Sequence, residues 1–146
     1  MANYQHVLLA VDISSDDAAV IDKALEVASH NDARLTLIHV VEYTGTLYAG
    51  DIPLPEDLDL DRRLADQAEE KLQALIKQRQ LADVDYLVEI GVPKREIVRV
   101  AEDKGADLIV IGSHGRHGLQ LLLGSTANGV LHQAKCDVLA VRVTKT

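Results

Sequence analysis

The spacing of apolar residues changes several times along this chain. Five short runs rich in Val, Ile and Leu alternate with four stretches in which apolar residues recur at helical spacing. Short apolar runs of this kind are typical of strands buried on both faces, and the longer stretches are typical of helices with one buried face. The predicted strands are residues 6–12, 34–41, 84–90, 107–111 and 136–143.

Four predicted helices lie between these strands. The first begins at the potential N-caps Ser14, Ser15 and Asp16 and runs to about His30. The second starts near residue 58 and carries an inward stripe made of Leu64, Ala68, Leu72, Leu75 and Ile76. The third starts at Pro93 and is closed by Gly105, and the fourth covers residues 125–134.

This alternation predicts an α/β fold: a doubly wound, Rossmann-like, five-stranded parallel sheet with helices on both faces and right-handed crossovers. The 146 residues contain no linker and no internal repeat, so we expect a single domain over residues 1–146. Ligands of such sheets bind beyond the carboxyl ends of the strands, where the strand order reverses. Residues 12–15, 40–43, 91–92 and 112–125 are therefore expected at the site.

Residues 42–57 interrupt the pattern. They contain two glycines and two prolines and form a predicted loop that is long for a compact domain, which indicates function or mobility. An acidic run follows within and after this loop, and we interpret it as a solvated loop and helix start, which the helix dipole favours. Its members are Asp51, Glu56, Asp57, Asp59 and Asp61.

Composition and charge narrow the range of partners. The formal net charge of −8 argues against binding to nucleic acid or to anionic membranes, both of which attract basic proteins. No apolar run approaches the ~20 residues that span a bilayer. Residues 1–5 are polar and do not resemble a signal peptide, and the single Cys136 excludes an internal disulfide. We therefore expect a cytoplasmic protein.

The segment 112–126 is the part of the chain that best suits ligand chemistry. Glycines 112, 115 and 118 let a ligand approach the main chain, and consecutive free N–H groups form anion-binding nests. Gly124, Ser125 and Thr126 then open a helix, whose N-terminus attracts anions. The segment fits a polyphosphate, with His114 nearby and Arg116 adding charge; a plain glycine-rich turn capped by Ser125 fits the pattern equally well. Neither a Walker A motif nor a GxGxxG motif is present.

No catalytic or metal constellation accompanies this segment. His114 and His117 lie three residues apart without further ligands nearby, and Ser113 beside His114 is not triad geometry. We expect no enzyme, although slow ATP hydrolysis stays open. Asp12, at a strand end, suits either a helix cap or a contact to ribose or a metal ion. Cys136 opens a buried strand and is expected to be inert.

Several segments, in the same order, resemble the universal stress protein family over the whole chain. They are VLLAVDIS at 7–14, LTLIHV at 35–40, ADLIVIGSHG at 106–115, LLLGST at 121–126 and CDVLAV at 136–141. The resemblance implies the α/β fold derived above, a role in the stress response and, typically, a homodimer that pairs through the C-terminal strand. Some members of the family bind ATP and others do not.

The ATP-binding branch carries Gly, two residues, Gly, nine residues, Gly and then Ser or Thr. Here only eight residues separate Gly115 from Gly124, which resembles the non-ATP-binding branch, whereas the glycines themselves are retained. By position, the resemblance places Asp12 and Val40 at ribose and adenine, with Ala10 where ATP-binding members often have proline. It places the phosphates, with Mg²⁺ if ATP is bound, at Gly112, Gly115, Gly124, Ser125 and Thr126.

Two hypotheses follow from the resemblance. The first is an adenine-nucleotide-binding module that acts as a homodimer in the stress response. The second is a regulatory protein that binds no ATP and works through phosphorylation of Ser125 or Thr126, or through protein partners. Retained glycines, which cost stability where they have no use, favour the first.

Overall fold

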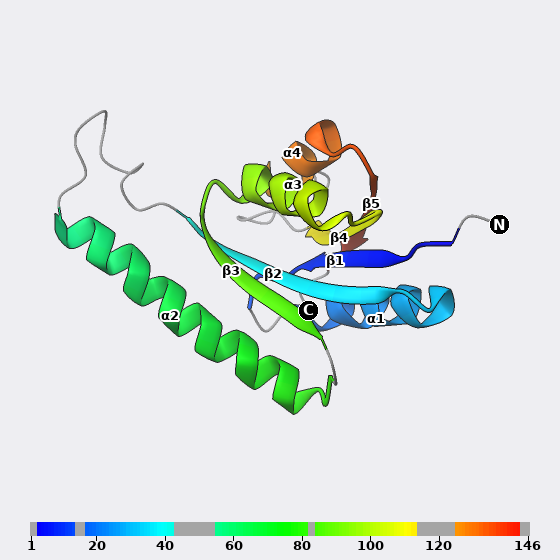
Figure 1. Cartoon of the computed structure of the whole chain (residues 1–146), viewed down its shortest axis with the longest axis horizontal. Helices are drawn as coiled ribbons and strands as arrows, with labels where there is room; N and C mark the ends of the chain where they lie inside the picture. The colour runs from blue at the N-terminus through cyan, green and yellow to red at the C-terminus, as the bar shows by residue number, and fades with distance from the viewer. Residues whose placement is uncertain (1–2, 14–16, 43–54, 82–83, 114–124, 144–146) are drawn as a thin grey trace.

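The computed structural model describes residues 3–13, 17–42, 55–81, 84–113 and 125–143, except for the side chains of residues 55–59. Strands and helices alternate in the predicted order (Figure 1). The strands are β1 (His6–Ala10), β2 (Arg34–Glu42), β3 (Asp85–Gly91), β4 (Leu108–Ser113) and β5 (Asp137–Arg142). The helices are α1 (Ala18–Asn31), α2 (Pro55–Gln78), α3 (Pro93–Lys104) and α4 (Ser125–Gln133).

The five strands form one parallel sheet in the order β3-β2-β1-β4-β5. The chain lays down β1, β2 and β3 toward one edge, then returns to place β4 and β5 on the other side of β1. The strand order therefore reverses between β1 and β4, and β3 and β5 are the two edge strands. This confirms the predicted doubly wound sheet.

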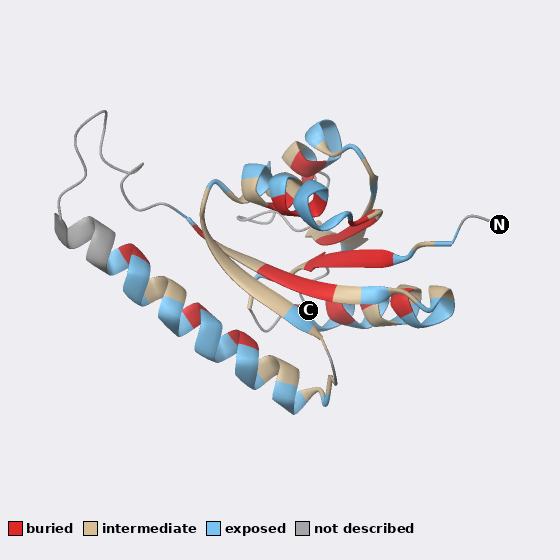
Figure 2. Cartoon of the chain, in the orientation of Figure 1, coloured by how far each residue is buried: buried red, intermediate tan, exposed pale blue. Residues whose placement is uncertain are grey.

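Side chains of the central strand β1 alternate between two hydrophobic clusters. Val7 and Leu9 belong to the cluster beneath α1 and α2, and Leu8 belongs to the cluster beneath α3 and α4. Each of the three is fully buried, so β1 is covered on both faces, as its continuous apolar run predicts. Figure 2 shows the buried positions concentrated in the central strands and on the inward sides of the helices.

The ends of α3 match the residues that were predicted to start and stop it, whereas the start of α1 shows a different N-cap. Pro93 occupies the first turn of α3, and Gly105 ends the helix in the left-handed conformation with φ 69°, both as predicted. The N-cap of α1 is Asp17, whose side chain makes no capping hydrogen bond. The predicted caps Ser14, Ser15 and Asp16 lie outside the described residues.

Helix α2 differs from the prediction in two respects. It begins at Pro55, three residues earlier than expected, because proline is tolerated at the first helical position. The prediction of a solvated acidic run was wrong for Asp61, which is only 3% exposed. Asp61 is seven residues before Ala68 and eleven before Leu72, and this spacing puts it on the helix face that the two buried residues occupy.

Candidate functional site

The carboxyl ends of β1, β2 and β4 meet at one edge of the sheet, as parallel pairing requires. Ala10 pairs with Ile38, and Leu9 pairs with Val110. Continuing both registers past the end of β1 brings Asp12 level with Val40 on one side and with Ser113 on the other. The positions predicted from the first, second and fourth strands therefore converge where the strand order reverses.

Ala10 and Val40 also point to the same face of the sheet. Both pack against the cluster beneath α3 and α4. Asp12 is two positions after Ala10 and therefore lies on the same side by strand periodicity, with an exposed side chain. The N-terminus of α4 covers this same face, so the three residues and the α4 N-terminus share one side of the carboxyl edge.

The main chain leaving β1 is held by three hydrogen bonds. The Val11 N–H donates to the Ile38 carbonyl over 2.9 Å, and His39 Nδ1 donates to the Val11 carbonyl over 2.8 Å. The Asp12 N–H donates to Asp17 Oδ2 over 2.9 Å. The neighbouring strand and the start of α1 therefore fix the backbone that leads into Asp12. His39 is half-buried in β2.

Ile13 is the residue of this turn that sequence reasoning missed. Its φ of 57° puts a β-branched side chain in the left-handed region, which such residues rarely adopt. Backbone strain of this kind persists only where the surroundings enforce it, and it gathers at binding sites. No local signal in the sequence identifies Ile13, because glycine or asparagine would be expected at such a position.

The exit of β4 supplies the other wall of the site. Gly112 and Ser113 are half-buried at the end of the strand, and Ser113 Oγ donates to the Val141 carbonyl of β5 over 3.3 Å. α4 then begins at Ser125, which is exposed, followed by Thr126, which is half-buried. The first backbone N–H groups of this helix have no carbonyl partner within the helix and attract anions. The predicted site residues His114, Gly115, Arg116 and Gly124 lie outside the described residues.

Neither a metal-binding cluster nor a bilayer-spanning helix occurs among the described residues, and the buried His6 is remote from this edge. No cluster of three or more His, Cys, Asp or Glu side chains suited to a metal ion occurs among the described residues. His6, at the opposite end of β1, is buried against Thr36 of β2, with 2.7 Å between His6 Nε2 and Thr36 Oγ1. In the described part of the chain, no helix has the length and apolar character needed to cross a bilayer.

The pKa values of Asp107 and Cys136, which precede β4 and β5, are both shifted. Burial opposes ionisation of Asp107, but hydrogen bonds from the backbone N–H groups of Gln5 and His6 outweigh it and hold the pKa of Asp107 below its usual value. Burial, and next the charge of Asp137, raise the pKa of the Cys136 thiol. Cys136 lines a cavity of about 260 Å³ together with residues of α3, such as Val98 and Ala101, and with Ala134, which follows α4. A thiol with a raised pKa is a poor nucleophile.

Comparisons with known proteins agree over nearly the whole chain. The model of the universal stress protein family matches residues 3–142. Universal stress protein A homolog 2 of Coxiella burnetii is 40% identical over 144 residues, covering 98% of each chain. Universal stress protein UspA of Lactobacillus plantarum has a TM-score of 0.79 at 26% identity, covering 97% of this chain and 100% of the other.

A second solved structure bears on ligand chemistry. It is a universal stress protein in complex with cAMP, with a TM-score of 0.64 and 26% identity, covering 98% of this chain and 100% of the other. The family model, the sequence relative and the two solved structures each match nearly the whole chain. The chain therefore belongs to the universal stress protein family.

Proposed function

We propose that this chain binds an adenine nucleotide, with ATP as the expected ligand, at the carboxyl edge of its sheet and acts through that binding in the stress response. The observation that carries the proposal is the convergence of Ala10, Asp12 and Val40 on the side of the sheet where α4 begins. A sugar-binding carboxylate, two apolar side chains and a helix N-terminus are the groups that a nucleotide needs. A relative that binds cAMP supports the same ligand class.

Each group has a defined part in this proposal. Ala10 and Val40 flank the base with apolar surface, and the Asp12 carboxylate accepts hydrogen bonds from ribose hydroxyls. The phosphates contact the N–H groups at the start of α4, with Gly112, Ser125 and Thr126 beside them. His114, Gly115, Arg116 and Gly124 complete the phosphate contacts in the proposal. Mg²⁺ would bridge phosphate oxygens and keep several of its waters.

We further propose that the whole chain acts as one cytoplasmic module and pairs as a homodimer through β5. β5 is an edge strand whose interior residues 138–141 are apolar and half-buried. An uncovered apolar edge invites association, and a two-fold partner would cover it. Light scattering at micromolar concentration should give the mass of a dimer; the mass of a monomer would refute the pairing.

The proposal assigns no catalytic residue. Ser113 donates its hydroxyl hydrogen to a backbone carbonyl, so it is not poised beside a base as a nucleophile must be. Any ATP hydrolysis is expected to be slow, because the proposed contacts hold the phosphates without a general base. Turnover that persists through further purification and disappears in Asp12→Asn would contradict this.

A regulatory role without ATP is the second candidate, and the eight-residue spacing between Gly115 and Gly124 favours it. The exposed Ser125 hydroxyl at the start of α4 is well placed for phosphorylation, because a phosphate is stabilised at a helix N-terminus. This candidate predicts that the protein stays unliganded in millimolar Mg·ATP.

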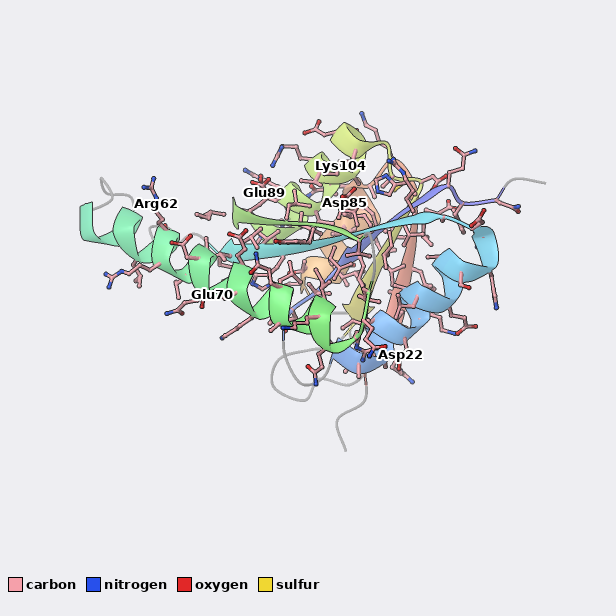
Figure 3. The ribbon with its side chains drawn as sticks, turned by 60° about the horizontal axis from the view of Figure 1, so that its bottom comes forward. Asp22, Arg62, Glu70, Asp85, Glu89 and Lys104 are labelled. Atoms are coloured by element: carbon pink, nitrogen blue, oxygen red, sulfur yellow. The ribbon has the colours of Figure 1, made fainter. Side chains whose placement is uncertain are left out.

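Native mass spectrometry followed by calorimetric titration separates the two candidates. Wild-type protein should retain a mass near that of an adenine nucleotide, and Asp12→Asn should bind ATP about tenfold more weakly because it loses charged hydrogen bonds to ribose. Asp85→Asn is the matched control: it removes the same charge from the exposed start of β3, at the opposite edge (Figure 3). Equal affinities of the two variants would refute the placement of the ribose.

A further inference from the structure

Lys94, in the first turn of α3, lies directly against α4. A Cβ atom built on Gly129 would lie 2.5 Å from Cδ of Lys94, 3.0 Å from its Cβ and 3.3 Å from its Cγ. A side chain at position 129 would therefore force the Lys94 stem to move from its place. The absence of a side chain at Gly129 therefore provides the space in which the methylene stem of Lys94 crosses α4.

The N-termini of α3 and α4 lie at the same edge of the sheet as the proposed phosphate site. Both helices run back from the carboxyl edge of the parallel sheet and cover the same face, so their N-termini lie at that edge. Side chains on a helix lean toward its N-terminus. The ammonium group is two bonds beyond Cδ, and Ser125 is four residues, about 6 Å of helix rise, before Gly129. From its place against Gly129, the Lys94 ammonium group is within reach of the first turn of α4.

The ammonium group of Lys94 has no ion-pair partner in the part of the chain that the structure describes. Within the described residues, no carboxylate lies within ion-pair distance of its ammonium group, and Glu96, on the same helix, pairs with Arg99 at 2.8 Å. The helix dipole disfavours a cation in the first turn of α3. The net charge of the chain is −8. Neither an ion pair with a described residue nor the helix dipole favours a positive charge at position 94, so we look for a ligand that does.

We propose that Lys94 pairs with the terminal phosphates of the bound nucleotide and so makes the site selective for a polyphosphate over a nucleoside. The inference rests on the proposed nucleotide site and deepens it. A Walker lysine, which approaches the phosphates from the loop itself, is absent here. Lys94 supplies the corresponding positive charge from a neighbouring helix, across the space that Gly129 leaves open.

The test uses variants that separate charge from packing. Lys94→Met keeps an unbranched apolar stem against Gly129 and removes the ammonium group, whereas Lys94→Arg keeps the charge. Lys104→Met removes the same charge from the other end of α3 (Figure 3), about 15 Å along the helix, where the Lys104 side chain is exposed. Titrations with Mg·ATP, adenosine and inorganic tripolyphosphate measure the three affinities of each variant.

We expect Lys94→Met to bind ATP and tripolyphosphate roughly tenfold more weakly, with adenosine affinity changed less than about twofold. Lys94→Arg should recover most of the loss, and Lys104→Met should match wild type. If Lys94→Met binds ATP as tightly as wild type, or loses adenosine and ATP affinity equally, the inference is wrong while the nucleotide site stands. If wild type binds tripolyphosphate through Lys94 but not ATP, the adenine site is wrong instead. Failure of wild type to bind any of the three overturns both.

Discussion

The buried pair of His6 and Thr36 provides a sharp test of how β1 and β2 are held together. His6 is 5% exposed and Thr36 is 1% exposed. His6 Nε2 lies 2.7 Å from Thr36 Oγ1, and His6 Nδ1 lies 3.1 Å from the Lys104 carbonyl, a shorter contact than the 3.4 Å to Arg34 Nη2. A carbonyl only accepts, so we assign the ring hydrogen to Nδ1, and the Thr36 hydroxyl donates to Nε2.

Replacing Thr36 with valine keeps the shape of the side chain and removes the hydroxyl. The buried ring nitrogen then has no donor, which costs about 1–3 kcal/mol of unfolding free energy. With a urea slope of about 2 kcal/mol/M, the midpoint of unfolding should fall by roughly 1 M at an unchanged slope. Chemical denaturation followed by circular dichroism measures both quantities.

Two further variants control this experiment. Thr36→Ser keeps the hydroxyl and loses one methyl group, so it should be more stable than Thr36→Val although its cavity costs about 1 kcal/mol. The double variant His6→Leu/Thr36→Val removes both partners and should regain part of the loss, with a coupling of about 1–2 kcal/mol. A Thr36→Val protein as stable as wild type would refute the reasoning, because the hydrogen bond would then contribute nothing.

Three further predictions follow from the described contacts. Asp107→Asn should lower the unfolding free energy by about 1 kcal/mol at pH 7. The difference in unfolding free energy between wild type and variant should narrow below about pH 4, because a carboxylate whose pKa is lowered in the folded state stabilises the protein only where it is ionised. Denaturation at several pH values measures this difference. Leu72→Ala, at a fully buried position of α2, should cost about 2–5 kcal/mol, whereas Leu60→Ala, at a position 40% exposed, should cost under about 1 kcal/mol; equal losses would contradict the packing of α2. Iodoacetamide should modify Cys136 more slowly in the folded than in the unfolded protein at pH 7. Asp137→Asn should speed the reaction of the folded protein, because the charge of Asp137 raises the pKa of the thiol. A folded wild-type protein that reacts as fast as the unfolded one would show that the thiol is not shielded.

Most element types were predictable because local patterns agree with the fold. The continuous apolar run of β1 indicates burial on both faces, and Pro93 and Gly105 mark the ends of α3 through their own backbone preferences. The start of α2 was not predictable from the same rules, because Pro55 is compatible with a loop as well as with a first helical turn. Burial of Asp61 also escaped prediction, since an acidic residue near a helix start is usually solvated.

The candidate site was predictable only as a set of chain positions. Asp12, Val40 and Gly112 were expected at strand ends because parallel strands place their carboxyl ends together. The contacts that shape the edge join residues far apart in the chain: His39 Nδ1 donates to the carbonyl of Val11. The strained backbone at Ile13 depends on this environment as well, and no residue preference foretells it.

The sequence by itself determined the class of fold, the alternation of elements and the family, because each follows from local periodicity or from short matching segments. Tertiary structure alone decided which strands are neighbours, and hence that Asp12, Val40 and Ser113 lie level with one another. It also decided that Lys94 crosses α4 at Gly129. Positions 94 and 129 belong to different helices, and a hydrophobic pattern within either helix carries no information about how closely their surfaces approach. That distance is set by how both helices pack on the shared sheet.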